Sequence, residues 1–235
     1  ILPYAIMKKY FSCFTNTEKC NNEILNMFSE KRKTLNWDVN LEKVDVQDKR
    51  IESFFNNIYI TYSKQKKKII KLWGDKTPIN IHFINFIDPE FKKSKYIFLI
   101  RDARDVILSY KQLKHHKAVD TEFAIWKWND SIKQLKFLQK NTDVLIIKYE
   151  DLVTNPIIEV NKVLVYLGLE ENNELINLKS ESSAMGVGEK EHHQNLNKPI
   201  SSTSVGKWKE KLSVEDITLV EKRCSKIMKE FGYII

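Results

Sequence analysis

One arginine and one serine, eight positions apart, are suited by type and spacing to hold an anion. Arg101 directly follows the apolar run YIFLI at 96–100, and Ser109 comes eight residues later. A guanidinium presents a planar fork of N–H donors that can grip a phosphate with two hydrogen bonds, and a serine hydroxyl can supply a third. A structural interpretation competes, because Arg101 could pair with Asp102 or Asp105 in the same RDARD segment. The pattern alone leaves both interpretations open.

The elements that must position these side chains follow from the hydrophobic pattern. Apolar runs at 95–100 and 144–147 predict two strands buried on both faces of a parallel sheet. Such sheets bind ligands at the carboxyl ends of their strands, which is where Arg101 would lie. The same pattern predicts a helical region over 1–68, a possible strand at 69–73, and helices over about 105–112, 122–138, 156–167 and 214–231.

Capping and packing residues sharpen these predictions. Asn155 and Pro156 are suited to start one helix that Gly168 would end, and Ser213 with Asp216 forms a capping-box-like start for the last helix, which Gly232 would end. The apolar stripes place Cys224 in the core. At least one of Trp126 and Trp128 should also be buried, because residues two apart point in different directions on a helix.

Four segments resemble a known family in the family's own order. KYIFLIRDARDVILS at 95–109 resembles the 3′-phosphate-binding segment of sulfotransferases that use PAPS (3′-phosphoadenosine 5′-phosphosulfate). GDKTP at 74–78, KYEDL at 148–152 and the stretch from 198 to 208 resemble further segments of its bacterial and tyrosylprotein branch. The resemblance implies an α/β fold of three layers, with a central parallel sheet flanked by helices as in P-loop kinases, after a helical N-terminal segment. It also implies a single domain over 1–235.

The resemblance assigns roles to individual residues. Arg101 and Ser109 would bind the 3′-phosphate, and Lys76 would stabilise the negative charge that develops on the leaving nucleotide. The remaining candidates are Tyr149, Lys198 and Lys207 as nucleotide contacts and His192 as a residue that orients the sulfuryl group. Each has a plainer alternative: a surface turn lysine for Lys76, packing on the next helix for Tyr149, one more surface lysine for Lys207, and a loop histidine for His192. Trp208 fits core packing better than adenine stacking.

Two parts of the family pattern have no match in this sequence. No segment reads like the loop P-[RK]-[SC]-G-[TS]-[TS] that binds the 5′-phosphosulfate, and all six glycines lie at or after Gly74. The glutamate or histidine base that follows that loop is also missing, so no general base is assigned. We expect the loop, its strand and the base to lie upstream of Ile1. The expected reaction is sulfuryl transfer from PAPS to a hydroxyl or amine acceptor, with PAP as product and no metal.

Composition and net charge limit the cellular compartment and the classes of partner that we expect. The formal net charge is +8, and the lysine-rich patch at 64–68 reads as a solvated face that could also attract anions. Three cysteines without paired spacing argue against a disulfide framework or a zinc site and favour a cytoplasmic protein. No apolar run is long enough to span a membrane. The acceptor could be a tyrosine peptide, a carbohydrate, a lipid or a small metabolite, and the oligomeric state is open.

Three other functions compete with this one. The first is a non-catalytic, nucleotide-binding relative that has lost the phosphosulfate loop. The second is a kinase-like phosphotransferase, which would need Mg²⁺ and a P-loop lysine. The third is a basic nucleic-acid binder, which is disfavoured because the aromatic residues fall on helical core stripes and not on an exposed basic face.

Overall fold

The computed structural model describes residue 26 and residues 39–45, 47–48, 50–112, 120–177 and 200–234. They fall into two compact units. The described residues up to 94 form the N-terminal unit, and those from 95 to 177 together with 200–234 form the C-terminal unit. The single domain expected over 1–235 stays a prediction.

The C-terminal unit is built on two parallel strands. β1 (Tyr96–Ile100) pairs with β2 (Val144–Lys148), with Ile97 opposite Leu145 and Ile100 opposite Lys148. Two helices, α5 (Ala103–Lys111) and α6 (Thr121–Leu138), connect the strands. Parallel strands need a long crossover of this kind, so both predicted strands and both predicted helices are confirmed.

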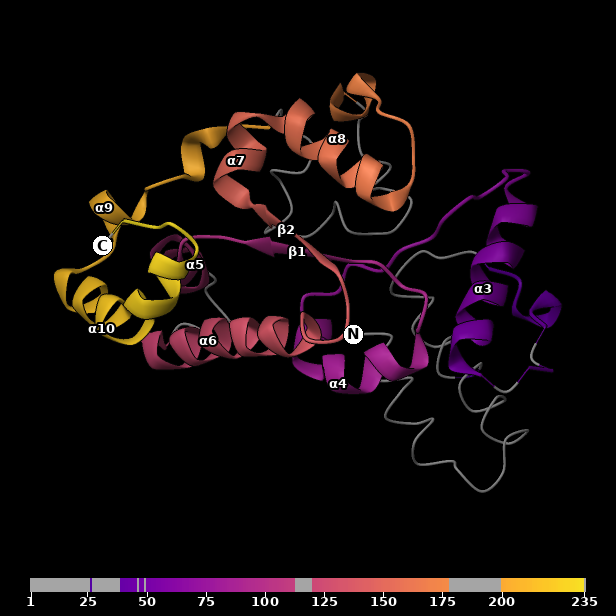
Figure 1. The fold of residues 1–235 in the computed structure, drawn as a ribbon, viewed down its shortest axis with the longest axis horizontal. Coiled ribbons are helices and arrows are strands. Elements are labelled where there is room, and N and C mark those ends of the chain that lie inside the picture. The colour runs from indigo at the N-terminus through magenta and orange to yellow at the C-terminus, as the bar shows by residue number, and fades with distance from the viewer. Residues whose placement is uncertain are drawn as a thin grey trace. The chain divides into compact units, whose positions relative to one another are not determined.

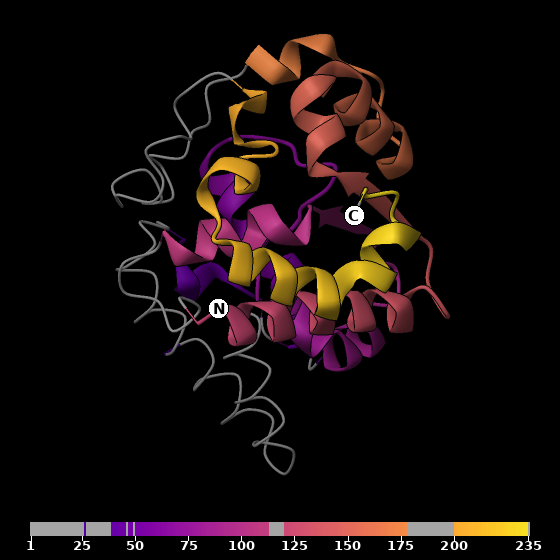
Figure 2. The ribbon, with the colours of Figure 1, turned by 90° about the vertical axis from the view of Figure 1, so that its left-hand side faces the viewer.

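Helices lie on both faces of the sheet, as Figure 1 shows from one side and Figure 2 from another. On one face, α5, α6 and α10 (Val214–Glu230) enclose a core with Ile107, Ile132 and Val220 fully buried. On the other face lie α7 (Tyr149–Thr154) and α8 (Pro156–Leu167). The three-layer α/β architecture is therefore confirmed. The unit also contains η5 (Asn173–Asn177), η8 (Ser202–Ser204) and α9 (Trp208–Lys211).

Helix ends follow the capping residues closely. The Ser213 hydroxyl accepts a hydrogen bond from the Asp216 amide at the start of α10, and Gly168 ends α8 in the left-handed region at φ +79°. Helix α5 begins two residues earlier than predicted because the Asp102 side chain caps it. Cys224 and Trp128 are buried and Trp126 is exposed, as expected.

The prediction that β1 is buried on both faces is wrong. Ile97 and Leu99 are 43% and 52% exposed, whereas Ile100 is buried. The cause lies in the packing of the second face, where α8 contacts β2. Within the described residues, the core that α5, α6 and α10 form covers only the opposite face of β1.

The N-terminal unit is organised around α3 (Ile51–Gln65), whose buried side chains recur at the predicted helical spacing. Ile51, Phe54, Phe55 and Ile58 form its inner stripe, and the lysine-rich patch at 64–68 is exposed as predicted. The other described elements are short: η1 (Leu41–Lys43), η2 (Asn80–Phe83), α4 (Ile84–Ile87) and η3 (Asp88–Glu90).

The predicted strand at 69–73 is wrong. No strand forms there, and Ile69 is 98% exposed. An aromatic contact holds the end of this run instead. The ring of Trp73 stacks on that of Tyr59, with centroids 4.5 Å apart and planes 11° apart, and its indole N–H donates to the Asn56 side chain. Trp73, the last residue of this apolar run, therefore packs in an aromatic contact and not in a sheet.

Candidate functional site

The carboxyl end of β1 carries the predicted anion site, and we call residues 101–105 the strand-end corner. Asp102 starts α5 by accepting a hydrogen bond from the Arg104 amide at 2.8 Å. The backbone amide of Asp102 donates to the Glu150 carboxylate, 3.0 Å away on α7 at the end of the neighbouring strand. The ends of β1 and β2 are thus joined directly, as expected for parallel strands that form a site at one edge.

Arg101 is held at this edge with donor capacity to spare. Its Nη2 donates to the Ser204 carbonyl oxygen at 2.6 Å, and its guanidinium carbon lies 4.3 Å from the centroid of the Tyr149 ring. Its Nε is buried and has no hydrogen-bond partner in the described part of the chain. A buried N–H without an acceptor is costly, so this donor suits an incoming acceptor such as a phosphate oxygen.

The competing interpretation of Arg101 as part of a local ion pair does not hold. Asp102 pairs with Arg104, whose Nη2 and Nε lie 2.7 and 3.1 Å from its carboxylate oxygens. Asp105 accepts hydrogen bonds from backbone amides of the C-terminal segment. Both carboxylates named as alternative partners are therefore engaged elsewhere.

Arg104 is the structural arginine of the corner. It is buried, its Nη1 lies 2.9 Å from the Glu221 carboxylate, and its Nη2 donates to the Ile234 carbonyl oxygen at 2.8 Å. Its guanidinium also lies 3.8 Å from the centroid of the Trp208 ring. Burial alone would lower the pKa of Arg104, but the hydrogen bonds and charges of Asp102 and Glu221 outweigh burial and raise the pKa above its ordinary value. This side chain is fully committed to the fold.

Ser109 lies on α5, and the turn that carries Lys207 is bound to the same helix. Ser109 is exposed on α5, four residues after Asp105 and so on the same helix face. Asp105 binds the amides on either side of Lys207, so the Lys207 turn packs along the face that also carries Ser109. Among the described residues, neither side chain has a hydrogen-bond or ion-pair partner. The structure brings Tyr149 and the turn that carries Lys207 to Arg101 and to the first turn of α5, the helix that also carries Ser109.

The Tyr149 ring contacts the Arg101 guanidinium, which the plainer interpretation of packing on the next helix did not include. It begins α7 directly after β2, and its ring faces the Arg101 guanidinium. A cation above an aromatic face is attracted by about 0.5–2 kcal/mol, depending on how far the pair is desolvated. This contact restricts the orientation of the arginine.

The remaining predicted residues lie elsewhere. Lys76 belongs to the N-terminal unit, where its side chain is exposed. Asp75 beside it accepts from Thr77 Oγ1 at 3.2 Å and from Asn80 Nδ2 at 2.5 Å, which closes the GDKTP turn. Burial, with a smaller effect of the Asp75 charge, raises the pKa of Tyr59 above its ordinary value. His192 and Lys198 lie outside the described residues.

Sequence reasoning missed the part that the C-terminal tail plays. The Tyr233 hydroxyl donates to the second oxygen of Glu150 at 3.0 Å, and the Lys148 ammonium lies over the Tyr233 ring. Burial first, and then Glu150, raise the pKa of Tyr233 well above its ordinary value. The signal available in the sequence was Glu150 itself, because a carboxylate two residues after a strand needs a hydrogen-bond donor as its partner.

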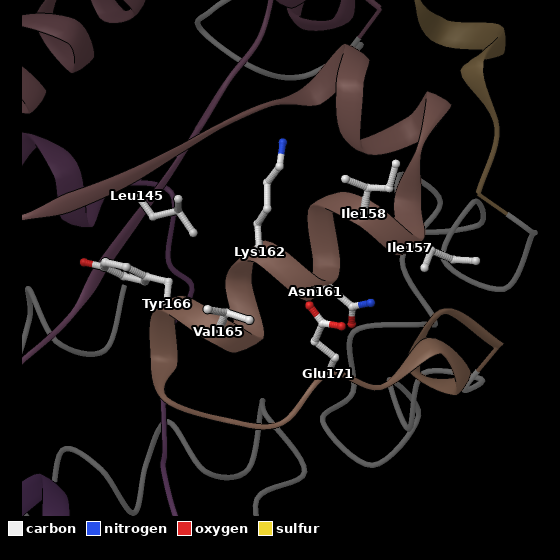
Figure 3. Close-up of a pocket in the computed structure, with 8 residues that line it drawn as sticks. All are labelled: Leu145, Ile157, Ile158, Asn161, Lys162, Val165, Tyr166 and Glu171. Atoms are coloured by element: carbon white, nitrogen blue, oxygen red, sulfur yellow. The ribbon is translucent and has the colours of Figure 1, made fainter.

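Two other features of the described residues do not belong to this site. Figure 3 shows a pocket lined by Leu145 of β2, by side chains of α8 and by Glu171, and it contains none of the predicted site residues. No cluster of three or more metal-binding side chains occurs in the part of the chain that the structure describes. Within the same residues, no helix has the length and apolar character needed to cross a membrane.

The comparisons with known proteins identify the family of this chain. The model of the Sulfotransferase family matches residues 8–173, which is most of the chain and includes part of both units. A putative protein-tyrosine sulfotransferase of Caenorhabditis briggsae is 25% identical over 138 residues, covering 56% of this chain and 48% of that protein. Sulfotransferase 1E1 of Bos taurus is 32% identical over 100 residues, covering 36% of this chain and 34% of that protein. The chain thus spans about half or less of the length of these curated relatives.

Solved structures show the same fold. The sulfotransferase domain from the Synechococcus PCC 7002 olefin synthase aligns with a TM-score of 0.54 and 23% identity, over 76% of this chain and 64% of that one. The sulfotransferase domain from the curacin biosynthetic pathway aligns with a TM-score of 0.52 and 18% identity, over 88% and 84%. Because the family model covers well over half of the residues and the fold agrees, this chain belongs to the sulfotransferase family.

Proposed function

We propose that this protein transfers a sulfuryl group from PAPS to a hydroxyl or amine acceptor and that the strand-end corner holds the 3′-phosphate of the donor. One observation carries the proposal. Arg101 lies at the carboxyl end of β1, braced by Tyr149, with a buried Nε that lacks an acceptor. Charge-assisted hydrogen bonds to phosphate are roughly twice as strong as neutral ones, so such an arginine suits this ligand.

Three side chains at this edge of the sheet supply the donors. Arg101 offers a guanidinium, Ser109 an exposed hydroxyl, and Lys207 an ammonium on a fixed turn. Tyr149 acts through Arg101 in this proposal, because its ring restricts the arginine. A ligand phosphate would have to share Arg101 with the Ser204 carbonyl or displace that carbonyl.

Lys76 is proposed to act on the rate of transfer. Sulfuryl transfer is an in-line displacement in which negative charge builds on the oxygen that leaves with the nucleotide. An ammonium near that oxygen stabilises the transition state more than the ground state, which is what accelerates a reaction. The exposed Lys76 side chain, on a turn closed by Asp75, is available for this role. His192 as a residue that orients the sulfuryl group and Lys198 as a nucleotide contact remain part of the proposal.

The acceptor is proposed only as a hydroxyl or amine compound. One relative is named as a putative protein-tyrosine sulfotransferase, and the names of the other relatives state no acceptor. Peptide tyrosine, carbohydrate, lipid and small-metabolite acceptors should therefore all be supplied in the first assay.

The test uses protein that includes the segment expected upstream of Ile1, and it measures binding and transfer separately. Isothermal titration calorimetry with PAP tests the corner, and transfer of ³⁵S from labelled PAPS to a panel of the four acceptor classes tests the activity, with and without EDTA. Binding of PAP together with EDTA-resistant transfer supports the proposal. Binding without transfer to any acceptor favours the non-catalytic relative, and transfer that EDTA abolishes and Mg²⁺ restores favours the kinase-like alternative. A wild-type chain that binds no PAP contradicts the assignment of the corner.

A further inference from the structure

The turn that carries Lys207 is held at several points by the strand-end corner. Arg101 Nη2 binds the Ser204 carbonyl at 2.6 Å, and the Arg104 guanidinium lies 3.8 Å from the centre of the Trp208 ring. Asp105 makes two further hydrogen bonds to this turn. Residues about one hundred positions apart in the sequence are thereby locked together.

Asp105 makes the most direct of these contacts. One carboxylate oxygen accepts from the Gly206 amide at 2.7 Å, and the other accepts from the Trp208 amide at 3.0 Å. These are the two amides that flank Lys207. Gly206 has φ +72°, a left-handed conformation that favours glycine and brings its amide toward the carboxylate. Asp105 is 2% exposed, so both bonds are shielded from water.

This arrangement has a consequence for Lys207. A carboxylate that binds two amides fixes the direction of the backbone between them, while the Lys207 ammonium has no partner among the described residues. A loop ordered during folding need not be ordered again when ligand binds, and such preorganisation increases affinity. The contact thus orders the backbone of the turn that carries the Lys207 cation.

We propose that Asp105 is a positioning residue that holds the 206–208 turn so that Lys207 meets the phosphates of the nucleotide. This inference rests on the proposed function of the corner. Asp105 touches no ligand in this account, and a negative charge at this site would itself repel a phosphate. Its carboxylate instead accepts hydrogen bonds from the two amides and acts only through Lys207.

The variant Asp105→Asn tests the contact with little change in volume. An asparagine can accept from one amide through its Oδ1, but its own NH₂ group would face the second amide, so one buried N–H loses its partner. We expect PAP affinity to fall about tenfold, as for about 1.4 kcal/mol. Glu159→Gln is the matched control, because Glu159 is a buried carboxylate of the same unit that pairs with Lys162 on α8.

A double-mutant cycle separates positioning from a general loss of stability. Lys207→Ala should weaken PAP binding about tenfold in the wild-type background but less than threefold beside Asp105→Asn, because a displaced turn no longer presents the ammonium. A merely structural effect would leave the Lys207→Ala penalty unchanged. Gly206→Ala disturbs the same turn from its other side, and it replaces Asp105→Asn in the cycle if that variant does not fold.

Hydrogen exchange tests the contact without any nucleotide. In the wild-type chain free of ligand, amides of 204–208 should exchange slowly, and Asp105→Asn should accelerate them while the peptide over β2 is unchanged. Equal exchange in wild type and variant would overturn the contact, and additive penalties in the cycle would overturn the positioning role. If the wild-type chain binds no PAP, the proposed function and the role of Lys207 both fail, and hydrogen exchange still decides whether Asp105 holds the turn.

Discussion

The strand-end corner and the GDKTP turn are held in different ways. Corner residues bind partners far away in the sequence, such as Ser204 for Arg101 and Ile234 for Arg104. The GDKTP turn at 74–78 is closed by neighbours, since Asp75 binds Thr77 and Asn80. The corner is therefore fixed by the tertiary fold, whereas Lys76 extends from a local turn with an exposed side chain.

This difference predicts that the corner determines nucleotide affinity and that Lys76 determines the rate of transfer. A cation that the tertiary fold holds in place suits ligand binding, because its geometry exists before the ligand arrives. A cation on a local turn can be recruited to charge that develops during the reaction, which changes the rate more than the affinity. Substitutions in the two regions should therefore separate affinity from turnover.

Loss of the Lys76 charge should produce the largest effect. Lys76→Met keeps most of the side chain's bulk and should lower kcat roughly 100- to 1,000-fold, by analogy with the loss of one donor that stabilises charge in a transition state. PAP affinity should change little. The measurement is steady-state transfer kinetics combined with calorimetry on the same variant.

Lys71→Met is the matched control, because Lys71 is another exposed lysine of the same unit. Normal kcat in Lys76→Met would return Lys76 to a surface turn lysine. A collapse of PAP affinity with normal kcat at saturation would remove the distinction between the two regions.

Removal of the Arg101 guanidinium should weaken binding. Arg101→Ala should cost about 1.5–3 kcal/mol of PAP affinity, the range for a hydrogen bond to a charged group, which is roughly 10- to 150-fold. Arg101→Lys should recover only part of this loss, because an ammonium keeps the charge without the planar fork. Arg223→Ala, at an exposed arginine that pairs with Glu122, serves as control and should bind PAP normally. Normal PAP affinity in Arg101→Ala would show that the corner is not the binding region.

The aromatic stack beneath the GDKTP turn should affect stability and not nucleotide affinity. Trp73→Leu removes the stacking on Tyr59 and the indole hydrogen bond to Asn56. We expect the free energy of unfolding to fall by about 2 kcal/mol in urea denaturation, because an aromatic pair and a hydrogen bond each contribute about 1 kcal/mol. A loss of PAP affinity as large as that of Arg101→Ala would contradict the separation of the two regions.

The smallest expected effect depends on pH. Burial alone would raise the pKa of Asp216, but hydrogen bonds from Lys111, Thr121 and Ser213 outweigh it and hold the pKa below its ordinary value. A lowered pKa in the folded state stabilises the fold in full above the unfolded pKa of about 3.9, and this contribution is lost as the pH falls through the folded pKa.

Asp216→Asn should therefore lower the free energy of unfolding by about 1 kcal/mol at pH 7, with a difference that shrinks below about pH 4. Urea denaturation across this range measures it, and PAP affinity at pH 7 should stay normal because Asp216 joins α5, α6 and α10 away from the corner. Asp120→Asn is the control, since asparagine caps a helix about as well as aspartate. A difference that grows in acid would contradict this account of Asp216.

Local signals explain which parts of the fold and of the site could be predicted. The apolar run before Arg101, Pro156 in the first turn of α8 and the Ser213 cap lie within a few residues of what they determine, so strands and helices were predicted closely, although the Asn155 side chain makes no capping hydrogen bond. The run at 69–73 was misread because a short apolar segment can serve a strand or an aromatic cluster equally well.

The different roles of Arg101 and Arg104 in the RDARD segment could not be predicted from the sequence. Arg101 and Arg104 are both arginines near the end of a strand, yet one keeps an unpaired donor and the other is fully engaged. The partners that separate them, Glu221 and Ile234, lie more than one hundred residues away. Only tertiary structure brings them together, and the same holds for Asp105 and the 206–208 turn.

A comparison of two nucleotides tests the assignment of the corner most directly. PAP and adenosine 5′-monophosphate differ only in the 3′-phosphate, so their affinity ratio isolates recognition of that group. Calorimetry on the wild-type chain should show PAP bound at least roughly 10- to 150-fold more tightly, and Arg101→Ala should remove most of this ratio and leave only what Ser109 contributes. Equal binding of the two nucleotides by the wild-type chain, or a ratio that survives Arg101→Ala undiminished, would contradict the assignment of the 3′-phosphate to this corner.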